Sequence, residues 1–96
     1  MNLFVNAKLL QTKKVANKAS TSEKFKAEVI IAIGRFFNND WGDVCNADKV
    51  SNEEAIPYYE MVVALYETSE GDIWITGESS DKHNYDKVVI AFPDDY

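Results

Sequence analysis

Carboxylates capable of metal or acid–base chemistry gather in one short segment, residues 40–55. The segment reads DWGDVCNADKVSNEEA and carries Asp40, Asp43 and Asp48 ahead of Glu53 and Glu54. Oxygen ligands of this kind suit Ca²⁺ or Mg²⁺, provided that the segment curls on itself. Their spacing departs from that of an EF-hand loop, in which acids occupy alternate positions before a glycine. A divalent-cation site is therefore one of two interpretations of this segment.

The other interpretation is structural, and it is the one that we favour. Asp40 and Asp43 would cap turns or short helices, Trp41 would fill the core, and Gly42 would allow an unusual backbone conformation. With Asp48, these residues make up the candidate structural motif of a polar connection between two elements.

Nucleophilic catalysis has little to build on in this chain. His83 is the single imidazole and stands in a polar stretch, SSDKHNY, while Cys45 is the single thiol and has no basic residue beside it. Zinc sites need several such ligands, and the four scattered glycines form neither a P-loop nor a dinucleotide fingerprint. We expect no catalytic residue, no cofactor-binding residue, no bound metal and no enzymatic activity.

Length and composition indicate one domain over residues 1–96. An apolar fraction of 46% can fill one core at this size, and one cysteine cannot form an internal disulfide. The N-terminal residues lack the pattern of a signal peptide, and no run of 18 apolar residues occurs. We therefore expect a cytoplasmic protein that does not span a membrane.

Charge is distributed unequally along the chain. Residues 1–49 carry eight Lys or Arg against five Asp or Glu, whereas residues 50–96 carry two against eleven. The net charge of −6 argues against direct nucleic-acid binding. Six lysines of the first half are either a local basic patch or a solvated surface (Lys8, Lys13, Lys14, Lys18, Lys24 and Lys26). The acidic half is either a recognition surface for a basic partner or a solubility feature.

Hydrophobic spacing predicts a helical first half. Residues 2–10 alternate loosely, as in a strand. Thr12 can cap a short helix through Ala19, and Ser20 with Glu23 fits a capping box for a longer helix. That helix has one apolar face at helical spacing (Phe25, Val29, Ala32, Ile33 and Phe36). The run Asn38-Asn39-Asp40 should end it.

The second half predicts mainly strands. Ser51 and Glu54 offer another capping box, but Pro57 limits that helix to a short one. Residues 58–67 and 73–78 should form a hairpin around the turn at 69–72, a polar loop should follow, and residues 87–92 should be the last strand before Pro93. The sequence thus predicts an α+β fold. A helical N-terminal half packs on a small antiparallel β-meander of three to four strands, with the N-terminal strand added to an edge.

Both faces of that meander are apolar, which raises the question of what covers the outer one. If Tyr59, Met61, Val63 and Leu65 face the helices, then Val62, Ala64 and Tyr66 point away from them. Cover could come from the chain's own N-terminal strand and short helices, or from a partner or a second copy. For the second case the candidate interaction surface combines two aromatic anchors with nearby acids (Tyr66, Trp74, Glu60, Glu67, Glu70, Asp72 and Glu78).

Several motifs resemble those of a small bacterial family often labelled "plasmid-related protein". They are DWGD-x-C-x-x-DK-x-x-NEEA at residues 40–55, the pair Leu65-Tyr66, IWIT-x-E at 73–78 and the tail VVIAFPDDY. Members of that family are encoded on plasmids, phages and integrated elements. The resemblance implies a mobile-element setting and supplies no catalytic residues.

The functional hypothesis is a non-catalytic protein that binds a host or mobile-element protein. Its more specific form is an anti-defence inhibitor of the anti-CRISPR kind, which presents carboxylates where a nuclease expects phosphates. A homodimer through the sheet face is another hypothesis for its partner. The alternative is a metal-dependent accessory factor or enzyme that uses the acids of residues 40–54.

Overall fold

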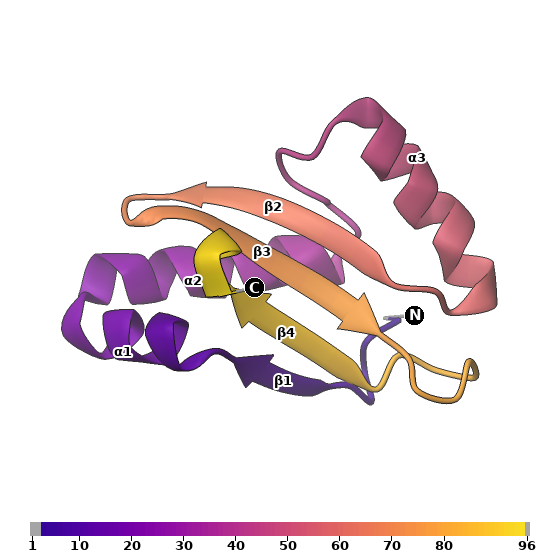
Figure 1. Cartoon of the computed structure of the whole chain (residues 1–96), viewed down its shortest axis with the longest axis horizontal. Helices are drawn as coiled ribbons and strands as arrows, with labels where there is room; N and C mark the ends of the chain where they lie inside the picture. The colour runs from indigo at the N-terminus through magenta and orange to yellow at the C-terminus, as the bar shows by residue number, and fades with distance from the viewer. Residues whose placement is uncertain (1–2, 96) are drawn as a thin grey trace.

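The computed structural model describes residues 3–95 and has an α+β fold (Figure 1). Its helices are α1 (Lys13–Thr21), α2 (Glu23–Phe37) and α3 (Asn46–Ala55), with the short 3₁₀ helices η1 (Ile56–Tyr58) and η2 (Pro93–Asp95). Its strands are β1 (Lys8–Gln11), β2 (Val62–Thr68), β3 (Gly71–Glu78) and β4 (Lys87–Ala91). No helix within residues 3–95 has the length and apolar character needed to cross a membrane.

The four strands form one mixed sheet in the order β1-β4-β3-β2. Strands β2, β3 and β4 make the predicted antiparallel meander, and β1 adds to its edge parallel to β4. The prediction of a purely antiparallel sheet is therefore wrong at this strand. The physical reason is the long connection between the two strands. Between β1 and β4 the chain passes through three helices and the β2–β3 hairpin, and a connection of that length permits parallel pairing.

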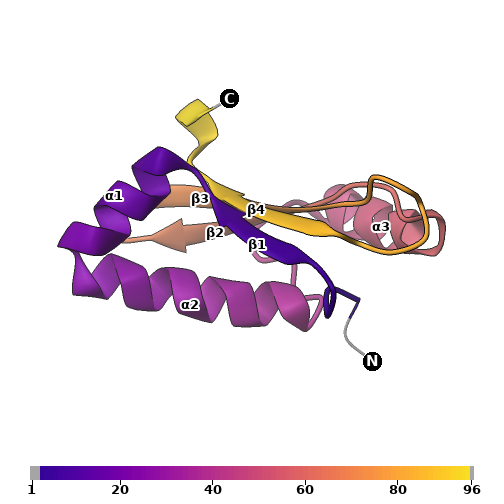
Figure 2. The same cartoon turned by 90° about the horizontal axis from the view of Figure 1, so that it is seen from below.

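Helix α2 covers one face of the sheet, which we call the inner face, and α1 packs on α2 at the end of the sheet (Figure 2). On the other side, the outer face, η2 is the one helical element of residues 3–95 that lies over the sheet, where it contacts β3. Helix α3 packs beside β2 at the sheet margin. The core lies between α2 and the inner face and contains the predicted helix residues Phe25, Val29, Ala32 and Phe36, with Ile33 packed against them.

The first strand is shorter than predicted. Residues 3–6 form a turn closed by a hydrogen bond from the Ala7 amide to the Phe4 carbonyl, and Asn2 lies outside the described residues. The turn places the Phe4 ring in the core, 4.7 Å from Phe36 and 5.1 Å from Tyr85. Burial of this ring favours the turn over continued strand alternation.

Thr12 caps α1 as predicted, since its hydroxyl accepts a hydrogen bond from the Val15 amide at 3.3 Å. The cap of α2 is Ser22 rather than Ser20, and it accepts from the Phe25 amide at 3.1 Å. Ser20 belongs to the last turn of α1, where its hydroxyl donates to the Asn17 carbonyl. The capping-box prediction failed because α1 continues two residues further than its hydrophobic pattern indicates.

Helix α3 begins five residues before the predicted start at Ser51. Its N-cap is Cys45, which makes no side-chain hydrogen bond, so no capping residue marks the beginning. The predicted polar connection is consequently a helix from Asn46 onward. The helix ends at Ala55 near Pro57, as expected from the missing proline N–H, and η1 follows directly.

The predicted hairpin, loop and last strand are all present, but β2 begins four residues later than predicted and β3 two residues earlier. The assignment of strand faces is wrong, however. Val62, Ala64 and Tyr66 are buried against the helices, whereas Val63 and Leu65 lie on the outer face. A left-handed residue at Tyr59 (φ 54°) precedes the strand. The predicted alternation was counted from Tyr59, but the strand begins only at Val62. The predicted pattern is therefore out of phase by one residue, and such a shift exchanges the two faces of a strand.

The free edge of β2 is closed by the chain itself. The Leu65 amide donates to the Trp41 carbonyl at 3.2 Å, and its carbonyl accepts from the Asp43 amide at 2.7 Å. Two residues earlier, the Asn52 side chain donates to the Val63 carbonyl at 2.8 Å and accepts from its amide at 3.1 Å. An amide side chain thus replaces a neighbouring strand, which protects this edge from pairing with other chains.

Candidate functional site

Two acids of residues 40–55, Asp40 and Glu53, bond to different partners. The Asp40 carboxylate accepts from Arg35 Nε at 2.8 Å and from the Gly42 amide at 3.1 Å. The bond to Arg35 lowers the pKa of Asp40. Glu53 accepts instead from the Trp41 indole at 2.9 Å. Among residues 3–95, no three His, Cys, Asp or Glu side chains come together in a way that could hold a metal ion.

Trp41 and Gly42 fix the approach of this segment to β2. Trp41 is 4% exposed and meets Phe36 edge to face, with ring centroids 5.5 Å apart. Gly42 has φ 74°, and a Cβ atom there would lie 2.0 Å from the Leu65 carbonyl oxygen. Asp43 contributes its amide to the β2 edge, and Asp48 lies in the first turn of α3. Together these placements give the segment a packing role.

Within residues 3–95, no hydrogen bond joins the side chain of His83 or of Cys45 to another residue. His83 is exposed in the loop after β3, where its amide donates to Asp81. Cys45 is exposed at the start of α3.

Tyr66, one of the two predicted interface anchors, is a core residue. It is 1% exposed, its hydroxyl donates to the Asp40 carbonyl at 2.6 Å, and the Arg35 guanidinium lies 5.0 Å from the ring centroid. Burial raises the pKa of its phenol. The prediction that Tyr66 is an interface anchor is wrong because the faces of β2 are exchanged.

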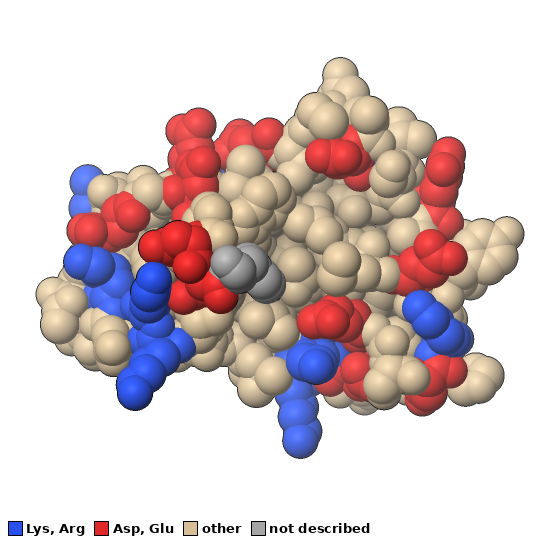
Figure 3. All heavy atoms as spheres, viewed as in Figure 1, with Lys and Arg blue, Asp and Glu red and all other residues tan. Residues whose placement is uncertain are grey.

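Trp74 lies on the outer face, opposite the helices. Two rows of mainly apolar side chains cross the sheet there. One row consists of Leu10, Val89, Thr76 and Val63, and the other of Ala91, Trp74 and Leu65. We call these two rows the apolar band. Several of its members are partly exposed, and Figure 3 shows an uncharged central surface with Asp and Glu around much of its margin.

Two adjoining hollows open on this band. One, of about 300 Å³, is lined by Met61, Val63, Trp74, Thr76 and Glu78. The other, of about 310 Å³, lies toward α3 and shares Met61, Val63 and Trp74, adding Val44 and side chains from α3. The two hollows therefore form one groove, with Trp74 in its wall and α3 along one side.

Two carboxylates stand at the hairpin end of the apolar band. Glu67 and Asp72 are directly opposite each other in the β2–β3 register, and both are exposed. No Lys or Arg among residues 3–95 forms an ion pair with either. Like charges opposite each other destabilise a strand pair. This pair could have been found from the sequence, because a turn at residues 69–70 sets that register.

The remaining predicted acids lie around the same sheet with different surroundings. Glu78 lines the groove, and the exposed Glu60 precedes Met61. Glu70 lies at the hairpin turn and forms an ion pair with Lys18 of α1 at 3.3 Å. Glu70 therefore belongs to a different part of the surface from the groove.

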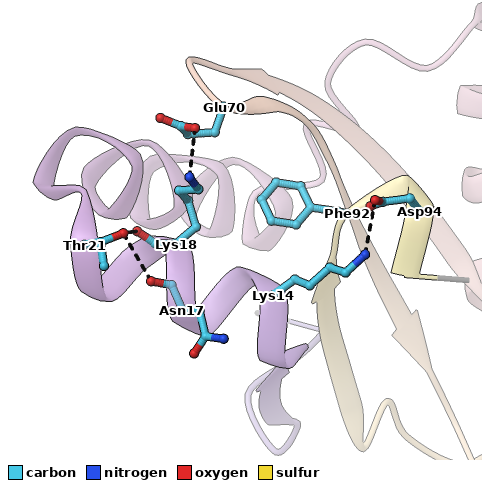
Figure 4. A pocket seen from close by; sticks show the side chains of 7 residues that line it. All are labelled: Lys14, Asn17, Lys18, Thr21, Glu70, Phe92 and Asp94. Atoms are coloured by element: carbon cyan, nitrogen blue, oxygen red, sulfur yellow. Dashed lines mark hydrogen bonds and ion pairs between the residues drawn. The ribbon is translucent and has the colours of Figure 1, made fainter.

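A larger hollow, of about 580 Å³, opens beside Phe92 between α1 and η2 (Figure 4). Lys14 reaches Asp94 at 3.2 Å across it, and Lys18 reaches Glu70. The Phe92 ring stacks on Phe25, with centroids 5.6 Å apart. Because both ammonium groups of this open hollow already have carboxylate partners, it offers no unpaired charge to a ligand.

Comparison of the chain with known protein families, with curated proteins and with solved structures gave no match. The motif resemblance to plasmid-related proteins therefore stays an expectation from the sequence.

Proposed function

We propose that this chain is a non-catalytic protein-binding module whose contact surface is the apolar band of the outer sheet face. The observation that carries this proposal is the groove at Trp74, which is apolar and open while the opposite face is covered by α2. A half-buried tryptophan beside aliphatic side chains is typical of the centre of a protein interface.

The proposed partner presents apolar side chains together with basic ones. Glu67 and Asp72 hold two unpaired carboxylates at one end of the band, and Glu78 adds another in the groove. A cationic group placed between Glu67 and Asp72 would relieve their mutual repulsion on binding. The surplus of acids in residues 50–96 would also speed the encounter with a basic partner.

The setting that we propose is a bacterial mobile element, on the basis of the motif resemblance. In that setting a protein with this surface would act on a host or mobile-element protein in the cytoplasm. An anti-defence inhibitor is the form that we propose, with carboxylates occupying a basic site that otherwise binds phosphates. The metal-dependent alternative would need its acids to converge, and no three such ligands come together among residues 3–95.

The first test replaces the anchor. The wild-type protein and Trp74→Ala are used to capture partners from a lysate of the bacterial host, and the affinity for each captured protein is then measured. Truncation of a central aromatic anchor costs about 2 kcal/mol or more, so affinity should fall about 30-fold or more. Ile31→Ala is the matched control, because Ile31 is an exposed aliphatic residue on α2 and should leave binding unchanged.

The second test separates binding from stability. Asp72→Lys removes the repulsion with Glu67, so the unfolding free energy should stay equal or rise by about 0.2–1 kcal/mol. Association with the same partner should slow and lose much of its salt dependence. An association rate that ignores this charge reversal, together with full affinity in Trp74→Ala, would exclude this face. A concentration-dependent dimer that Trp74→Ala dissociates would identify a second copy as the partner.

A further inference from the structure

The two edge strands of the sheet differ in how their outward backbone groups are bonded. At β2 the backbone groups of Val63 and Leu65 are bonded by Asn52 and by residues 41–43. At β1 no other strand of residues 3–95 follows, and all four of its residues are exposed. Figure 2 views the molecule from the β1 side, and no helix lies over this edge.

Hydrogen bonds to β4 determine which groups of β1 face outward. The Lys8 amide donates to the Asp86 carbonyl and the Thr12 amide donates to the Ile90 carbonyl, each at 3.0 Å. Residues that alternate with these, Leu9 and Gln11, must direct their N–H and C=O groups to the opposite side. Two donors and two acceptors, at the spacing of a strand, are therefore presented at an open edge.

Apolar surface accompanies these groups. Leu9 is 50% exposed and Leu10 is 43% exposed, and they project to opposite faces of the sheet. Leu10 is also the last member of the apolar band. A strand added beside β1 would cover part of both leucines and extend the band by one position.

The local charge is opposite to that of the molecule as a whole. Lys8 and Lys87 are neighbours in the β1–β4 register, and Lys13 follows β1 at the start of α1. None of these three forms an ion pair with the described residues. Glu78 is the one acid paired in register with Lys87, and the Asp86 carboxylate is bonded to the Ser80 hydroxyl. At the far end of β1, the Asp95 carboxylate accepts from the Thr12 hydroxyl at 2.7 Å, so the three lysines are the basic groups without a bonded partner at this edge among the described residues.

We propose that β1 accepts an extended, acidic segment of a partner protein as a fifth strand. Main-chain groups of the segment would bond to Leu9 and Gln11, and carboxylates on alternate residues would face Lys8 and Lys87. A second copy of this chain fits less well, because two β1 edges brought together would place the same unpaired lysines side by side. This site shares Leu10 with the apolar band but involves neither Trp74 nor the groove, so the Trp74→Ala and Leu9→Pro variants test the two proposals separately.

A displayed library of random 12-residue peptides, selected on the immobilised full chain, is the probe. We expect enrichment of sequences with β-branched residues alternating with Asp or Glu. The best peptide is then titrated into labelled protein, and amide hydrogen exchange is followed by NMR. Exchange at Leu9 and Gln11 should slow at least ten-fold on binding, while that at Leu10, which already bonds to β4, should change little.

Single substitutions distinguish main-chain pairing at the β1 edge from other modes of peptide binding. Leu9→Pro removes the outward N–H but none of the bonds to β4, and proline is tolerated where a strand N–H faces solvent. It should weaken peptide binding at least ten-fold, whereas Leu9→Ala should weaken it less than three-fold. The same peptide with alternate N-methylated residues should not bind. Lys8→Glu should weaken binding, and Lys26→Glu, on an exposed position of α2, should not.

Four outcomes would overturn the proposal. They are the absence of enriched peptides, enrichment of basic peptides, full binding to Leu9→Pro in a protein with a native circular dichroism spectrum, and a dimer of the wild-type chain that Leu9→Pro converts to monomer. The last outcome would identify a second copy of this chain as the partner that pairs with β1.

Discussion

At Gly42 the backbone passes so close to β2 that no side chain fits between them. Its φ of 74° disfavours other residues, and an added Cβ would meet the Leu65 carbonyl oxygen and the Tyr66 ring. We expect Gly42→Ala to lower the unfolding free energy by more than about 2 kcal/mol, since both backbone strain and overpacking contribute. Equilibrium urea denaturation measures this change.

Gly34 provides the matched control. It lies inside α2, and an added Cβ would contact nothing within 4 Å. Gly34→Ala should therefore raise the unfolding free energy by about 0.5–1 kcal/mol, through the helix propensity of alanine. A Gly42→Ala protein that is as stable as Gly34→Ala would contradict the close approach to β2.

Residue types alone indicate the packing roles of Trp41 and Gly42 but not the role of Tyr66. In a short polar segment, the large apolar side chain of tryptophan favours burial, and glycine favours a backbone conformation that other residues avoid. Both expectations match the observed placement. A tyrosine in a strand fits either face, and the face depends on where the strand begins. The register of β2 depends in turn on the left-handed turn at Tyr59, which its residue type does not indicate.

Among the elements, α3 closes the edge of β2 at Val63 through the side chain of Asn52. Asn52→Ala would leave the Val63 amide and carbonyl without partners, and Asn52 is only 5% exposed. We expect a loss of about 1–3 kcal/mol in unfolding free energy, together with faster aggregation, because the freed edge can pair with other chains. Urea denaturation and light scattering on warming measure the two effects.

Ser51→Ala is the control for this prediction. Ser51 precedes Asn52 in α3 and is exposed, so its replacement should leave both stability and aggregation nearly unchanged. Equal aggregation of the two variants would show that Asn52 does not protect the edge.

Elements with a strong local signal were predictable, and those without one were not. The α2 face and the β2–β3 hairpin follow from apolar spacing and turn residues. The start of α3 has no capping hydrogen bond, so sequence patterns placed it five residues late. Local sequence preferences predict the bounds of an element only where the chain has a specific capping residue or a clear hydrophobic period.

For the whole molecule, four aspartates link stability to pH. The Arg35 guanidinium lowers the pKa of Asp40, and hydrogen bonds from His83, Ser80 and Thr12 lower those of Asp81, Asp86 and Asp95. A lowered folded-state pKa stabilises the fold above the unfolded value, near pH 4, and this stabilisation is lost as pH falls through the folded value.

We therefore expect stability to hold or rise slightly from pH 7 to about 5, where the self-repulsion of the net charge of −6 is relieved, and to fall below about pH 4. Urea denaturation at several pH values tests this. Asp40→Asn should be less stable than wild type at pH 7, with the difference shrinking toward pH 3. Stability that increases steadily down to pH 2.5 would contradict the assignment.

The overall class was predictable, but the parallel pairing of β1 was not. Composition and periodicity led to an α+β fold with a three-stranded meander, and both are present. The partner of β1 lies almost eighty positions further along the chain, and no local pattern encodes such a pairing. For the same reason, the sequence does not predict the open β1 edge that is proposed above as a binding site.

The parallel neighbours β1 and β4 also determine how this protein would respond to tension. The chain enters β1 at one end of the pair and leaves β4 at the other end (Figure 1). A force that separates the two chain ends would slide these strands along each other, so their hydrogen bonds would share the load and fail together. A terminal hairpin would instead open one bond at a time. We therefore expect slow unfolding under traction for a protein of this size, governed by the rupture of one short pair of strands.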